Sequence, residues 1–221
     1  MQKPPPKKKK KKTPPSTKWT SLTDWDWGDW APRLKQFLKT INKPAITAHA
    51  SAITDKNLTM SEPFSAGQDW CCFEMVAGDH DETLVIARVQ LPALPETQAQ
   101  ALDRDYRTKC EVATMSYLGQ TTDLPIPRVY AYKEFNSTKA KQAGAPYMLL
   151  EGLYGNSLAD VNIDLSELPH GHLHPGQWTM IQARLASITF PEIGAIRAYS
   201  PSTGPILGPI STEEWEYWTF Q

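Results

Sequence analysis

The sequence of 221 residues lacks most of the features that mark secreted, membrane-spanning and metal-binding proteins. It has only three cysteines, with Cys71 and Cys72 adjacent and Cys110 far away, so neither a disulfide framework nor a cysteine-based metal site is indicated. No apolar run approaches the roughly 20 residues that a membrane-spanning helix needs, and the N-terminus lacks the apolar core of a signal peptide. We therefore expect an intracellular, cytoplasmic protein with no membrane span.

Excess charge of either sign is also lacking. The net charge is −1, from 23 basic and 24 acidic residues, so the chain as a whole has no electrostatic preference for nucleic acid or anionic membranes. Six lysines nevertheless run from Lys7 to Lys12 between prolines, and we expect residues 1–18 to be a disordered basic tail. The tail would act as a nuclear-import signal, as a contact for nucleic acid or other polyanions, or only as a solubilising end.

The remaining sequence has patterns of both helices and strands. Pro32 fits the first turn of a short amphipathic helix, whose apolar positions repeat at Leu34, Phe37, Leu38 and Ile41. Residues 70–77 and 83–91 flank the turn-rich GDHDE and predict a β-hairpin. The later elements are a helix over about 97–119, strands within 124–135 and 145–158, a helix over about 175–188 and two short strands within 192–210. This order predicts an α+β protein in which an antiparallel sheet packs against one helix.

Arg88 interrupts the apolar strand TLVIARVQL, and a cation in such a place needs a compensating charge. Glu111 is the best partner, because it shares a face of the predicted helix with Met115 and Leu118 and would point toward the sheet. Kinases hold the α- and β-phosphates of ATP with a strand cation and a helix carboxylate arranged in this way. Two simpler alternatives remain, a surface pair between Glu111 and Arg107, and an Arg88 that reaches water along its stem.

Five segments occur in order between about residue 29 and residue 210, namely GQDWCCFEMV, LVIARVQLP, KCEVATMSYLGQTTDLPIPRVYAY, GAPYMLLEGLYGNSL and EIGAIRAYSPSTGPILGPI. Their order resembles that of the aminoglycoside phosphotransferase family, in its fungal, protein-kinase-like branch. It implies a two-lobed fold that holds ATP between a small sheet lobe and a larger helical lobe. Residues 19–155 would be the kinase-like small lobe with its N-terminal helix, and residues 156–221 the hinge and an incomplete, truncated helical lobe.

The resemblance also implies the residues that contact the nucleotide. Gly67 and Gln68 would lie in the loop over the phosphates, and Arg88 would be the phosphate-contacting cation. Glu111 would be the helix carboxylate. The backbone of Glu151, Gly152 and Leu153 would form the hinge at the adenine edge. Two departures stand out, since no G-x-G-x-x-G is present and arginine replaces the usual lysine at position 88. The planar guanidinium of arginine binds phosphate in a different geometry from the compact ammonium group of lysine.

The catalytic half of such an enzyme is missing from the sequence. None of the five histidines begins the H-x-D motif that announces the base-like aspartate, and no metal-binding aspartate motif follows. We therefore expect a nucleotide-binding portion of a small-molecule kinase that is inactive alone. It would bind ATP, with Mg²⁺ only if the missing half were supplied, and its small hydroxylated acceptor is not identified.

A second reading is a non-catalytic interaction protein that binds a protein partner through its basic tail and the exposed surface of the truncated lobe. The alternating His170, His172 and His174 would suit Zn²⁺ or Cu²⁺ in an extended segment, but no cysteine or acidic cluster accompanies them, and we expect no metal site.

Overall fold

The computed structural model describes residues 30–67, 69–78, 82–92, 98–154 and 175–210. The elements are, in order, α1 (Trp30–Thr40), α2 (Lys43–Thr54), β1 (Leu58–Ala66), β2 (Trp70–Ala77), β3 (Leu84–Gln90), α3 (Gln98–Thr121), β4 (Val129–Lys133), α4 (Thr138–Ala143), β5 (Tyr147–Glu151), α5 (Pro175–Ser187), β6 (Ala195–Ser200) and β7 (Gly204–Gly208). The fold is α+β, as predicted, and all the helices and strands that the sequence indicated are present. None of the helices in the described ranges is both long and apolar enough to cross a bilayer.

Five strands form one antiparallel sheet in the order β1-β2-β3-β5-β4. The predicted hairpin is confirmed, with Trp70 opposite Gln90 and Cys72 opposite Arg88. Successive side chains of a strand point to opposite faces of the sheet. Cys71 is therefore buried in the core, whereas Cys72 lies on the other face beside Arg88.

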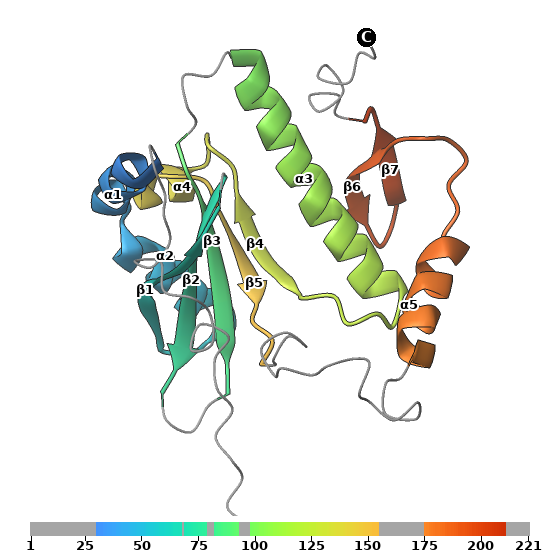
Figure 1. The fold of residues 1–221 in the computed structure, drawn as a ribbon, viewed down its shortest axis with the longest axis horizontal. Coiled ribbons are helices and arrows are strands. Elements are labelled where there is room, and N and C mark those ends of the chain that lie inside the picture. The colour runs from blue at the N-terminus through green and yellow to red at the C-terminus, as the bar shows by residue number, and fades with distance from the viewer. Residues whose placement is uncertain (1–29, 68, 79–81, 93–97, 155–174, 211–221) are drawn as a thin grey trace, which may run out of the picture.

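The main hydrophobic core lies on one face of this sheet. Residues of α1, α2 and α4 pack there against alternate residues of the strands, and the largest fully buried side chains of this core are Tyr147, Phe73, Ile46, Met75, Leu149, Val85, Val89 and Cys71. Figure 1 shows α1, α2 and α4 on one side of the sheet and α3 on the other. The expectation of one packed helix was incomplete, because three helices cover the core face.

Local chemistry explains why the first two helices form. Pro32 lies in the first turn of α1, and the predicted apolar face is confirmed, since Phe37 and Ile41 are buried in the core. Helix α2 begins at a cap in which the Asn42 side chain accepts a hydrogen bond from the Ala45 N–H at 3.2 Å. It ends at Asp55, whose φ of 54° is left-handed.

The last described elements pack on α3. Tyr117 of α3 contacts the rings of Phe190 and Tyr199 at 5.9 and 5.4 Å between centroids, and the Tyr106 hydroxyl donates to the Pro209 carbonyl at 2.7 Å. Arg184 of α5 pairs with Asp123, just beyond the end of α3. Figure 1 shows the β6–β7 hairpin on the side of α3 away from the sheet. The described residues after 174 include one helix, α5, and the two-stranded β6–β7 sheet.

Candidate functional site

Arg88 lies within β3, on the sheet face opposite the main core. Its register partners are Cys72 on β2 and Met148 on β5, while its chain neighbours Ala87 and Val89 are fully buried on the core face. The Arg88 side chain is 23 % exposed. Arg88 is therefore neither at a strand end nor free in solvent, which excludes the alternative of a cation that simply reaches water.

The predicted contact between Arg88 and Glu111 is confirmed. Nη1 of Arg88 forms a close hydrogen bond and ion pair with Oε1 of Glu111 on α3. The surface alternative is not what forms, because Arg107 instead pairs with Asp103 one turn earlier, with 3.0 Å between Nε and Oδ2. The Glu111 side chain is 38 % exposed, so the pair lies at the edge of the sheet–helix junction and can be reached from solvent.

Trp70 of β2 makes a second contact with the same guanidinium. The Cζ atom of Arg88 lies 4.7 Å from the centroid of the Trp70 ring, within the range of a cation–π interaction. Trp70 and Arg88 are diagonal neighbours across the β2–β3 pair, a distance that a large aromatic side chain can bridge. Nε and Nη2 of Arg88 donate no hydrogen bond to any residue that the structure describes. The N–H groups of Nε and Nη2 thus remain available to donate hydrogen bonds to an anionic oxygen.

The turn between β1 and β2 lies at the end of β3 that is nearer to Arg88. The Gly67 N–H donates to the Trp70 carbonyl and the Leu91 N–H donates to the Asp69 carbonyl, each at 2.8 Å. Gly67 is exposed, and an added Cβ there would meet nothing within 4 Å, so packing does not require glycine. Gln68, the other residue assigned to the phosphate loop, lies outside the described residues.

The three residues assigned to the hinge lie at the other end of this part of the sheet. The Glu151 N–H donates to the Arg128 carbonyl, and the Gly152 N–H donates to the Leu84 carbonyl, both at 2.8 Å. Leu153 is 51 % exposed and makes no hydrogen bond with the described part of the chain. Of the three backbone N–H groups, that of Leu153 is therefore the one still available for a ligand.

The register between β3 and β5 places the hinge and Arg88 along the same strand, β3. Glu151 is opposite Val85 and Met148 is opposite Arg88, so the two positions are three residues apart along β3. At about 3.3 Å per residue the separation is roughly 10 Å. The structure thus brings the hinge, the strand cation and the β1–β2 turn to one sheet, in that order along β3.

Cys72 lies directly opposite Arg88 but has little nucleophilic character. Burial raises the pKa of the Cys72 thiol, although the Arg88 charge opposes the shift. A thiol with a raised pKa is mostly protonated at neutral pH and reacts slowly. The site therefore offers hydrogen-bond donors and a positive charge rather than a covalent nucleophile.

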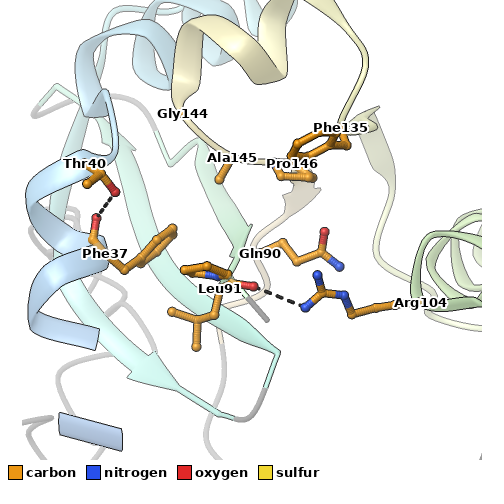
Figure 2. A pocket seen from close by; sticks show the side chains of 10 residues that line it. Phe37, Thr40, Gln90, Leu91, Arg104, Phe135, Gly144, Ala145 and Pro146 are labelled. Carbon is orange, nitrogen blue, oxygen red and sulfur yellow. Dashed lines mark hydrogen bonds between the residues drawn. The ribbon is translucent and has the colours of Figure 1, made fainter. Parts of the chain in front are cut away.

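A separate cavity lies beyond the end of β3, between α1, α3 and the loops around α4. Its volume is about 210 Å³, below the roughly 300–1,000 Å³ of most ligand sites. Figure 2 shows the Gln90 amide and the Arg104 guanidinium at this cavity, where Arg104 donates to the Leu91 carbonyl at 3.3 Å. No sequence pattern predicted the cavity, because it is assembled from distant segments. Its volume is too small for a nucleotide.

No group of three potential metal ligands occurs among the residues that the structure describes. The histidines at 170, 172 and 174 lie outside those residues, as does the basic tail.

Comparison with known proteins finds similarity over part of the chain. The chain is 39 % identical over 75 residues to a subtelomeric hrmA-associated cluster protein found in two strains of Aspergillus fumigatus. The match covers 34 % of this chain and 13 % of each of those proteins. No known family profile matches the chain, and no solved structure matches it.

Proposed function

We propose that this chain is the nucleotide-binding portion of a small-molecule kinase similar to the aminoglycoside phosphotransferases. The observation that carries the proposal is the Arg88–Glu111 pair, in which a strand cation is held by a carboxylate on the following helix. Kinases use this arrangement to hold the α- and β-phosphates of ATP. The proposal is supported further by the N–H groups of Arg88 that stay without a partner in the described residues.

In this proposal each predicted residue has a distinct task. Arg88 donates Nε–H and Nη2–H to phosphate oxygens and offsets their negative charge, while Glu111 fixes the guanidinium from the helix side. Gly67 and Gln68 belong to the turn that would lie over the phosphates. Leu153 supplies the N–H for the adenine edge, and the backbone of Glu151 and Gly152 anchors the hinge to its neighbouring strands.

The proposed activity is binding of ATP rather than turnover by this chain alone. The sequence contains no H-x-D motif, so we assign neither the base for the acceptor hydroxyl nor the ligands for Mg²⁺ to residues of this chain. The acceptor would be a small hydroxylated molecule.

Exposed apolar side chains favour a second candidate, a protein-interaction role. Trp178 and Leu185 of α5 are 64 % and 44 % exposed, while Ile181 is half-buried. Exposed apolar groups of this size are typical of binding surfaces or aggregation-prone sites.

Thermal unfolding with and without ATP tests the nucleotide-binding proposal. A ligand that binds only the folded state stabilises it by RT ln(1 + [L]/Kd), so millimolar ATP should raise Tm in the wild type. Glu111→Gln removes the charge that fixes Arg88 and should reduce this rise. An unchanged Tm in the wild type at all ATP concentrations would contradict nucleotide binding, and salt-sensitive binding of a protein partner that is lost on deleting residues 1–18 would favour the second candidate.

A further inference from the structure

Trp70 joins two parts of the candidate site. Its ring lies against the guanidinium of Arg88, with 4.7 Å between Cζ and the ring centroid. Its backbone carbonyl accepts the 2.8 Å hydrogen bond from the Gly67 N–H that closes the β1–β2 turn. One residue therefore contacts both the strand cation and the turn that would lie over the phosphates.

We propose that Trp70 is a positioning residue for anion binding, which holds the guanidinium plane of Arg88 so that its unpaired edge faces the ligand. This inference rests on the proposed nucleotide-binding function. It assigns Trp70 no contact with the nucleotide and no part in phosphoryl transfer.

The physical argument begins with the contact to Glu111. The ion pair joins one nitrogen, Nη1, to one oxygen, Oε1, and a single contact of this kind leaves the guanidinium plane able to rotate. The Trp70 ring, whose centroid lies 4.7 Å from Cζ, restricts that rotation. The carboxylate and the ring together fix both the position and the plane of the group, and this pre-organisation reduces the entropy lost when an anion binds.

The same geometry favours arginine over lysine at position 88. An ammonium group has no flat face to stack on an indole ring and no rigid fork of donors. Trp70 and Arg88 thus form a matched pair, and the benefit of the tryptophan should exist only when the cation is a guanidinium.

A double-mutant cycle with ATP as the probe tests this dependence. Binding is compared in wild type, Trp70→Leu, Arg88→Lys and the double variant, and Trp70→Phe serves as a variant that keeps an aromatic face. We expect Trp70→Leu to weaken ATP binding about 3- to 10-fold when residue 88 is arginine and less than about 2-fold when it is lysine. Trp70→Phe should stay close to wild type. An equal loss in both backgrounds, or no loss with Arg88, would overturn the proposal.

A nucleotide-free measurement separates this inference from the proposed function. The Nε–H resonance of Arg88 should be shifted upfield in the wild type by the ring current of Trp70. It should move toward its free position in Trp70→Leu but remain nearly unchanged in Trp70→Phe, while backbone amide signals away from β2 and β3 keep their positions. If wild type binds no ATP, the proposed function is wrong, but the Arg88 resonance still tests whether Trp70 positions the guanidinium. An Arg88 Nε–H resonance that keeps its position in Trp70→Leu would overturn the positioning role.

Discussion

Nδ1 of His49 on α2 and the hydroxyl of Tyr147 on β5 lie 2.7 Å apart in the core, and their rings meet edge to face with 5.8 Å between centroids. Burial, with smaller contributions from the charges of Lys139 and Lys133, lowers the pKa of His49 from 6.5 to about 4. His49 is therefore neutral in the folded protein at pH 7, and the hydrogen bond joins two uncharged groups across the core.

This pair predicts a loss of stability in mild acid. The pKa of His49 is lower in the folded than in the unfolded chain, so protons bind the unfolded state more tightly. The free energy of unfolding should be unaffected by His49 above pH 6.5 and fall as the pH drops from 6.5 toward 4, by at most about 3 kcal/mol. Denaturant unfolding across this range measures it.

The control for this prediction is His49→Gln, which keeps a polar side chain but does not titrate. The stability difference between wild type and His49→Gln should shrink between pH 6.5 and 4. A difference that stays constant over that range would contradict the assigned pKa.

The close packing of Gly152 against Leu84 predicts a second effect on the stability of the fold. A Cβ at this position would lie 2.2 Å from Cγ of Leu84, which is itself buried, whereas a Cβ on Gly67 would meet nothing within 4 Å. Gly152→Ala should therefore destabilise the fold by about 1–3 kcal/mol through overpacking, and the matched Gly67→Ala should have little effect. Chemical denaturation of both variants tests this, and Leu84→Ala should rescue part of the Gly152→Ala loss. Equal losses of stability in Gly152→Ala and Gly67→Ala would show that contact with Leu84 is not the reason for glycine at position 152.

Helix α5 should exchange its amide protons faster than the sheet. Its side chains are largely exposed, including Trp178 and Met180, whereas alternate residues of β3 are fully buried. Local opening is easiest where few apolar groups are buried. We expect weaker hydrogen-exchange protection over residues 176–188 than over residues 83–91. Equal protection in a demonstrably monomeric sample would show that the chain is a self-sufficient domain.

The isolated chain should show no phosphotransferase activity. The sequence offers no candidate base in a catalytic-loop context, and loss of a general base typically lowers the rate by about 10²–10⁴-fold even when the rest of a site survives. Phosphorus NMR of ATP mixed with the chain, Mg²⁺ and small hydroxylated acceptors should detect no transfer. Robust ATP-dependent phosphorylation of any of these acceptors by the pure chain would refute this prediction.

The sequence predicted the elements that have strong periodicity and missed those that do not. Strand β1 contains Pro63 and Glu62, and its register with β2 shifts on both sides of Pro63, so it lacks the clean alternation of a strand. Helix α2 is built from small and β-branched residues without a clear apolar stripe. Helix α4 has only six residues, too short to be recognised by pattern.

The candidate site was predictable where charge conflicted with environment. Arg88 stands out because a cation inside an apolar strand requires a partner, and helical spacing then pointed to Glu111. The Trp70 contact was not predicted, because it depends on the β2–β3 register and no periodicity in the sequence fixes that register. The hinge hydrogen bonds of Gly152 likewise depend on strand pairing, which only the fold supplies.

Calorimetric titration of ATP into wild type, Arg88→Met and Arg128→Met tests the central proposal most directly. Both variants remove a guanidinium from the same region of the sheet, but Arg128 is exposed, next to β4, and its guanidinium lies over Tyr130 rather than beside Glu111. Hydrogen bonds to charged groups contribute about 1.5–3 kcal/mol, so Arg88→Met should weaken ATP binding by at least about 10-fold. Wild type and Arg128→Met should bind ATP equally well. Wild type that fails to bind ATP, or equal affinities for the two variants, would contradict the assignment of Arg88 as the phosphate-binding cation.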